Sequence, residues 1–182
     1  DSRPDEWTSN FIPDSMGRHP IDEFFPGHSE LYLKAAASMP PFGKPVLEVV
    51  EDAVQDGRRK LKLAFVSPRK AQRVDFDVVS DIQVYAARAF GQDLDGAEEQ
   101  WDASFDILPG DGFALELDVD ADKPLKICVR ETSFCLPAIP GMPPRPDWMM
   151  AEPNRTVDHH RPMRSEHTFS KSTFDFGPAP KQ

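Results

Sequence analysis

The chain has 182 residues, which is long enough for one domain with a buried core. Its net charge of −10 argues against nucleic acid as a partner, because phosphate binding requires a basic face. No stretch approaches the roughly 18 apolar residues of a membrane-spanning helix, and no signal peptide is recognisable. Of the 19 prolines, all but Pro68, Pro109 and Pro124 lie at 4–45 and 137–180, which predicts a regular middle with extended segments on both sides.

The first segment, 1–45, is expected to be an extended linker that is partly ordered. Because the chain begins at Asp1 and not at methionine, we expect it to be a piece of a longer protein. One short helix is expected at 29–38, where Leu31 and Leu33 precede a run of alanine, the strongest helix former. This helix would pack on the fold that follows.

The middle segment, 46–135, alternates apolar and polar residues with a period of two, which indicates strands with one buried face. Gln55-Asp56-Gly57 is typical of a hairpin turn, and the acidic stretch 91–100 is expected to be a loop. The strands are expected at 46–51, 60–65, 73–78, 82–86, 101–108, 113–119 and 125–129. This spacing predicts an all-β fold, an immunoglobulin-like or fibronectin-like β-sandwich of about seven to eight strands.

The last segment, 136–182, begins with a proline-rich run, continues as a polar loop and closes with a strand at 167–176. The prolines favour a rigid strap over the sandwich, anchored by Trp148, Met149 and Met150, because these apolar side chains would otherwise form an exposed patch. The alternative is a polyproline II segment that docks into an aromatic groove of another protein.

Two cysteines, Cys128 and Cys135, follow no zinc or redox spacing. Two free thiols are the simpler interpretation. A local disulfide across a turn in an oxidising compartment is the alternative, although a short bridge requires particular geometry.

The sequence contains few residues that could bind a metal or catalyse a reaction. Histidines and carboxylates at Asp158, His159, His160, Glu166 and His167 could hold a metal, but nearby arginines oppose a cation. The carboxylates Asp118, Asp120 and Asp122 lack the glycine and distal glutamate of a calcium loop, and the pair Glu98-Glu99 has no histidine near it. We therefore predict no catalytic residue, no cofactor-binding residue and no metal ligand in this chain.

Several segments, in order along the chain, resemble the C-terminal soluble domain of membrane-anchored di-zinc exopeptidases, an aminopeptidase-type zinc metallopeptidase family. The resemblance is carried by 4–11, by 46–54 with 57–68, by the Leu-Pro turn at 108–115, and by the Pro-Arg-Pro and Met-Met motif at 143–150, followed by the closing segment 167–176. None of these segments is a catalytic signature, and the family's His-x-Asp zinc-ligand motif does not occur here.

The resemblance implies a non-catalytic accessory domain on the extracytoplasmic side of a membrane, periplasmic or lumenal. Its partners would be the catalytic and transmembrane portions of its own parent chain, and zinc would be bound in the parent's catalytic domain. The alternative is a stand-alone β-sandwich module that binds a carbohydrate or peptide through aromatic residues such as Tyr85, Trp101 and Trp148.

Overall fold

The computed structural model describes residues 5–12, 17–22, 31–36, 43–95, 100–106, 108–134, 143–149 and 168–179. The chain divides into two compact units. The flanking unit comprises Asp1–Pro41 and Phe134–Thr168, and the sandwich unit comprises Phe42–Ser133 and Phe169–Gln182.

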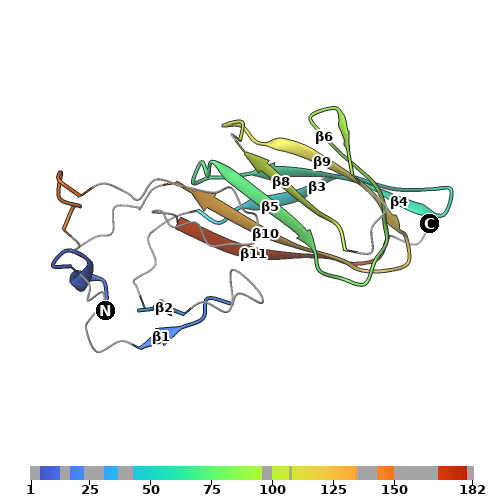
Figure 1. Ribbon diagram of the computed structural model, residues 1–182. Coiled ribbons are helices and arrows are strands. Elements are labelled where there is room, and N and C mark those ends of the chain that lie inside the picture. The colour runs from blue at the N-terminus through green and yellow to red at the C-terminus, as the bar shows by residue number, and fades with distance from the viewer. Residues whose placement is uncertain are drawn as a thin grey trace. The chain divides into compact units, whose positions relative to one another are not determined.

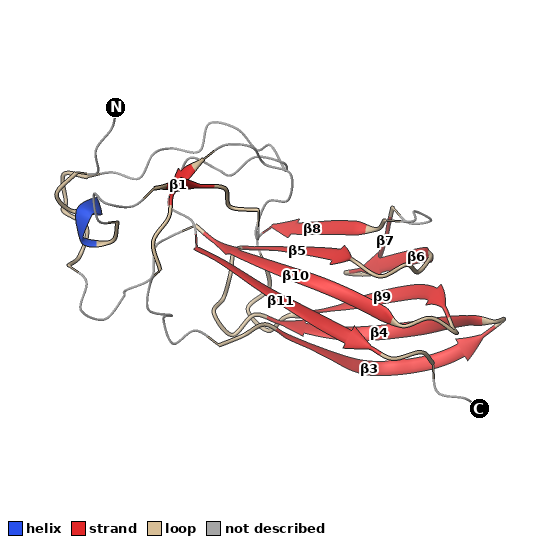
Figure 2. Ribbon diagram, turned by 90° about the horizontal axis from the view of Figure 1, so that it is seen from below, coloured by secondary structure: helices blue, strands red, loops and turns tan. Residues whose placement is uncertain are grey.

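The sandwich unit contains two antiparallel sheets (Figures 1 and 2). One is a five-stranded sheet in the order β3 (Val46–Gln55), β4 (Arg58–Val66), β9 (Phe113–Asp120), β6 (Val84–Ala89) and β7 (Gln92–Leu94). The other is a four-stranded sheet in the order β11 (Thr168–Phe176), β10 (Leu125–Ser133), β5 (Arg73–Val78) and β8 (Asp102–Asp106). The all-β sandwich predicted from the sequence is thus confirmed.

The strand order has a further regularity. With β3, β4, β5, β6, β9, β10 and β11 lettered A to G, the two sheets hold A-B-E-D and G-F-C, the order of a constant-type immunoglobulin domain, and β7 and β8 are added at the edges. The finer immunoglobulin-like or fibronectin-like assignment stays a prediction.

The core lies between the sheets and is built from alternate residues of each strand. Leu61, Leu63 and Phe65 of β4 are at most 2% exposed, as are Val74 and Phe76 of β5 on the opposite sheet. The remaining buried apolar side chains of this core are Leu47, Val78, Ile82, Val84, Ala87, Ala89, Trp101, Leu115, Leu117, Val119, Leu125, Ile127 and Val129. Burying this much apolar surface is the main stabilising contribution to the fold.

The β3–β4 hairpin turns at Asp56-Gly57, as the sequence predicts. Both residues have positive φ, 51° and 76°, which is the backbone of a type I′ turn and matches the right-handed twist of the strands. Gly112, before β9, has a different constraint: a Cβ there would lie 2.1 Å from the carbonyl oxygen of Phe65.

An inward-facing ion pair between Arg59 and Asp52 stabilises the β3–β4 edge of the sandwich. Arg59 of β4 is 4% exposed and donates to both carboxylate oxygens of Asp52 on β3, at 2.9 and 2.7 Å. Its Nη1 also donates to the carbonyl oxygen of Gly177, just after β11. Arg59 therefore joins the edge strand of one sheet to the chain that leaves the other, and it holds the pKa of Asp52 below the ordinary value.

Two sequence-based expectations about local structure are wrong. The helix expected at 29–38 is absent from its described part, 31–36, where Tyr32–Leu33 forms β2 and pairs with β1 (Arg18–His19). A helix of that length is marginal without tertiary support, so strand pairing prevails. The loop expected at 91–100 contains β7, because Phe90 and Gly91 close a second tight turn.

In the flanking unit, a 3-10 helix (Thr8–Asn10) follows Trp7. The indole Nε1 of Trp7 donates to the carbonyl oxygen of Pro143, 3.2 Å away and 136 positions along the chain. Trp148 is 76% exposed, which is not the burial expected of a strap anchor. Met149 is half-buried, and Met150 lies outside the described residues.

Candidate functional site

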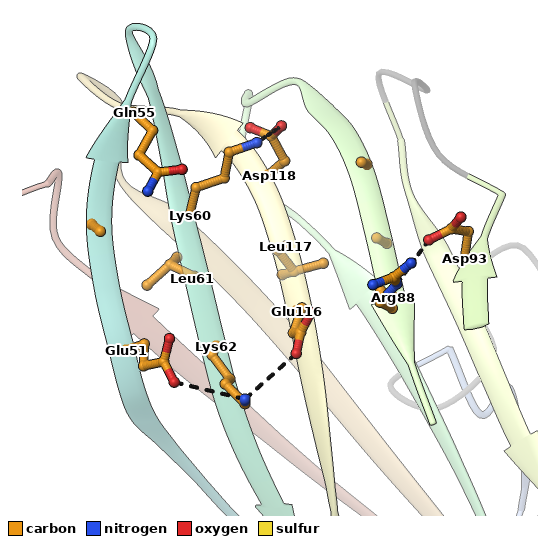
Figure 3. Close-up of a pocket in the computed structure, with 13 residues that line it drawn as sticks. Glu51, Gln55, Lys60, Leu61, Lys62, Arg88, Asp93, Glu116, Leu117 and Asp118 are labelled. Carbon is orange, nitrogen blue, oxygen red and sulfur yellow. Dashed lines mark hydrogen bonds and ion pairs between the residues drawn. The ribbon is translucent and has the colours of Figure 1, made fainter. Parts of the chain in front are cut away.

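A hollow of about 410 Å³ lies on the outer face of the five-stranded sheet (Figure 3), and we call it the charged hollow. It forms because alternate residues of each strand leave the core and point outward, and two of these, Ala53 and Ala86, are short. Its other outward side chains are Glu51, Gln55, Lys60, Lys62, Arg88, Asp93, Glu116 and Asp118.

The charges in this hollow neutralise one another across neighbouring strands (Figure 3). Lys62 Nζ of β4 lies 3.7 Å from Glu51 of β3 and 3.6 Å from Glu116 of β9. Arg88 Nε of β6 lies 2.9 Å from Asp93 of β7. Pairs this exposed contribute about 0.2–1 kcal/mol each, so they are available to a polar ligand at small cost.

Asp118, at one end of the charged hollow, is the most buried of these carboxylates, with 7% of the residue exposed. Its Oδ2 pairs with Lys60 and lies 3.6 Å from Nη1 of Arg58. Its Oδ1 is buried and accepts no hydrogen bond from the described residues.

A second hollow of about 430 Å³, which we call the Phe90 hollow, adjoins the first. The two share Lys62, Arg88 and Glu116 as lining residues. The Phe90 hollow adds apolar walls from Phe90, Phe113 and Pro109. The two hollows therefore adjoin each other at outward residues of β4, β6 and β9.

The outer face of the four-stranded sheet carries a different arrangement, a buried ionic cluster centred on Asp75 of β5. Its carboxylate accepts from Arg73 at 2.9 Å, from Ser104 at 2.6 Å and from Arg130 at 3.1 Å. Asp75 is 6% exposed. Burial is the largest single effect on its pKa and raises it, but the hydrogen bonds from Ser104 and Arg73 and the two guanidinium charges outweigh burial and lower the pKa.

Next to this cluster, Asp77 of β5 lies directly opposite Asp102 of β8. Burial raises the pKa of Asp77, and the charges of Asp75 and Asp102 raise it further against the pull of Arg130 and Lys171. Cys128 of β10, paired with Asp77, is a buried free thiol whose pKa is raised by burial, so little thiolate forms near neutral pH. Cys135 lies outside the described residues.

The carboxylates considered as a cation site do not converge. Asp118 pairs with Lys60, whereas Asp120 accepts from Tyr85 at 2.9 Å and pairs with Lys123 at 3.1 Å. Burial opposes ionisation of Asp120, yet the bonds from Lys123, from the Gln83 N–H and from Tyr85 together lower its pKa. Within the described ranges, no group of three or more potential ligands could hold a metal ion. The candidates Glu98, Glu99, Asp158, His159, His160, Glu166 and His167 lie outside the described residues.

The aromatic residues considered as a ligand platform are scattered. Trp101 is 2% exposed and donates its indole N–H to the carbonyl of Asp95 at 2.8 Å, so its proposed role in binding is wrong. Tyr85 is 37% exposed, but the Arg58 guanidinium covers its ring at 4.0 Å from the centroid. Trp148 belongs to the flanking unit. Among the described residues, the sequence reasoning missed two exposed aromatics, Phe90 at 53% and Phe134 at 49%, and the Phe-Gly dipeptide at 90–91 marks the first of them as a turn residue.

No protein-family model, curated protein or solved structure matches this chain. In the part of the chain that the structure describes, no helix has the length and apolarity to cross a membrane.

Proposed function

We propose that this chain is a non-catalytic accessory domain of a membrane-anchored di-zinc exopeptidase, located on the extracytoplasmic side of the membrane. Peptide hydrolysis would be carried out by a catalytic domain outside this chain, where the zinc is bound. The domain's partners would be the catalytic and transmembrane portions of the parent.

The observation that carries the proposal is the order of the resembling segments, together with the contact between two of them. Segment 4–11 and the Pro-Arg-Pro motif at 143–150 are far apart in sequence, yet they belong to one compact unit. The hydrogen bond from Trp7 Nε1 to the Pro143 carbonyl joins them directly. This contact supports the proposal that the resembling segments act together as one unit of the accessory domain.

An accessory domain needs a surface for its partner, and Trp148 is the best candidate for its centre. It is the most exposed of the large apolar side chains in the described residues, at 76%. It lies in a turn that the Met149 N–H to Pro146 carbonyl bond closes at 2.9 Å. Tryptophan is enriched among the residues that dominate binding at protein interfaces.

The test begins with the reading frame upstream of Asp1. The proposal expects it to encode several apolar spans preceded by a zinc domain with His-x-Asp and Glu-Glu motifs. That catalytic domain and this chain are then produced separately, and their association and the peptidase activity are measured.

We expect association that Trp148→Ala weakens by about tenfold or more, since an anchor at an interface is being removed. The matched control is Val79→Ala, an equally simple truncation of a side chain that is 54% exposed in the sandwich unit. An upstream frame without a zinc domain, or no association together with unchanged activity, rejects the proposal.

A further inference from the structure

The inward face of strand β11 is polar in its first half and apolar in its second. Phe174 and Phe176 pack against the core, whereas the two inward positions before them, Ser170 and Ser172, are half-buried serines. We call the first part of the strand, 168–172, the serine half and the rest the phenylalanine half. Because burial of apolar surface is the main force that holds a strand on a sandwich, the core anchors the phenylalanine half more strongly than the serine half.

Two contacts show how β11 lies along β10 at the edge of the four-stranded sheet (Figure 2). Ser170 Oγ donates to Oε2 of Glu131 at 2.9 Å. Five residues further along β11, Asp175 lies 3.1 Å from Nζ of Lys126, which is five residues back along β10. Both pairs fit one antiparallel register, in which the serine half lies beside Glu131 and the phenylalanine half lies beside the buried Ile127.

Glu131, on the inward face of β10, is a costly residue to enclose. It is 0% exposed, and its Oε1 is buried and accepts no hydrogen bond from the described residues. Arg69 donates to Ser133, two positions along the same face, at 2.9 Å and forms no ion pair with Glu131. A buried carboxylate without a counter-charge loses more by leaving water than one hydrogen bond returns, so the closed serine half lies over an unfavourable group.

We propose that the serine half of β11 is a hinged segment that detaches from β10 and closes again, while the phenylalanine half stays in the sandwich. Opening lets water reach the carboxylate of Glu131 and costs little apolar burial. The hinge is expected near Thr173, where the inward side chains change from serine to phenylalanine. Beyond the phenylalanine half, Arg59 donates to the carbonyl oxygen of Gly177 and restrains that end of the strand. This inference concerns the sandwich unit alone and does not rest on the proposed function.

Amide hydrogen exchange of the full, ¹⁵N-labelled chain measures this opening, because a paired amide exchanges only while its strand is open. The informative amides are those of Ser170, Ser172, Phe174 and Phe176, alternate residues whose N–H groups point toward β10 in this register. After correction for intrinsic rates, we expect the two serine amides to exchange at least about tenfold faster than the two phenylalanine amides.

Two variants test the cause of the difference. Glu131→Met removes the charge and keeps a side chain of similar length, so the Ser170 amide should exchange about tenfold more slowly than in wild type. Ser172→Val keeps Glu131 but adds apolar surface to the serine half, and it should also slow this exchange. The matched control is Glu116→Met on the outer face of the other sheet, where the side chain is 45% exposed and the exchange of β11 should not change.

Three outcomes overturn the inference. Equal protection of all four amides would show that β11 opens and closes as a whole. Faster exchange of the phenylalanine amides would place the weak half at the wrong end. Unchanged exchange of the Ser170 amide in both Glu131→Met and Ser172→Val would mean that neither the buried charge nor the lack of apolar surface controls the opening.

Discussion

The outer faces of the two sheets carry the same kinds of charged residue in opposite environments. On the four-stranded sheet, Asp75 is 6% exposed and accepts hydrogen bonds from two arginines and a serine. On the five-stranded sheet, Asp93 has a side chain that is 82% exposed, and its one ion-pair partner among the described residues is Arg88. The first face is a fixed ionic structure, and the second is a solvated surface whose ion pairs exchange readily with water.

The stabilising free energy of an ion pair therefore depends on how deeply the pair is buried. In water, the attraction between Arg88 and Asp93 is screened and nearly balanced by the cost of ordering two side chains. Around Asp75, removing the carboxylate takes the shared acceptor away from two largely buried arginines, which is costly. The ion pairs of the five-stranded face therefore suit a solvated surface, and the buried cluster around Asp75 suits a rigid support.

The largest effect is expected for Asp75→Ala, which leaves Arg73 and Arg130 without their shared carboxylate. We expect a loss of about 3–5 kcal/mol in the free energy of unfolding, measured by urea denaturation at pH 7. The lowered pKa means that Asp75 stabilises the fold above the ordinary aspartate pKa and that this contribution is lost as the pH falls through its folded-state pKa. The difference between wild type and variant should therefore shrink in acid, and a loss below about 1 kcal/mol at pH 7 would contradict the burial argument.

The next prediction compares the stability lost on truncating Arg59 and Arg58, two consecutive residues of β4 whose side chains face opposite ways. Arg59→Ala removes the inward guanidinium from Asp52 and Gly177, and roughly 3 kcal/mol of stability should be lost. Arg58→Ala, its matched control, removes an outward side chain that stacks on Tyr85, with an expected loss of about 0.5–1 kcal/mol. Equal losses in the two variants would show that orientation does not decide the energy.

A smaller change, in this case a gain in stability, is expected on replacing Asp77. Its raised pKa means that the folded protein binds a proton more readily than the unfolded chain, so this group lowers stability as the pH rises through its folded-state pKa. Asp77→Asn should therefore be more stable than wild type at pH 7, and the gain should vanish near pH 3.5, below the ordinary aspartate pKa of about 3.9. Denaturation curves at both pH values measure this, and a less stable variant at pH 7 would refute it.

The smallest effect is expected for Lys62→Ala on the five-stranded face. Its two contacts, at 3.6 and 3.7 Å, are longer than hydrogen bonds, so stability should change by no more than about 0.5 kcal/mol. The change should remain as small in 1 M salt, where any residual attraction is screened. A loss above about 1 kcal/mol would mean that this face, too, is a fixed ionic structure.

Much of the sandwich could be predicted because the sequence patterns that indicate its strands and turns involve neighbouring residues. The alternation at Leu61, Leu63 and Phe65 gave the buried face of β4, and Asp56-Gly57 gave the hairpin before it. The prediction of a helix at 29–38 was wrong. It rested on the alanine content of this short segment, whereas Tyr32–Leu33 pairs with Arg18–His19, which lies outside the segment.

The candidate site was harder to predict for the same reason. Alternation places Asp75 and Lys62 alike on outer faces and cannot say which is buried. Burial of Asp75 depends on Ser104 and Arg130, which lie 29 and 55 positions away along the chain. The exposure of Phe90 likewise depends on Phe105 and Phe113, each from another strand.

The strand periodicity, the tight turn at Asp56-Gly57 and the net negative charge can all be predicted from the sequence, because each follows from neighbouring residues or from composition. Which carboxylates are buried and which arginine joins the two sheets can be read only from the folded structure. Those properties arise between strands that are distant in sequence, and the free energy of a charge depends on how much water its neighbours exclude.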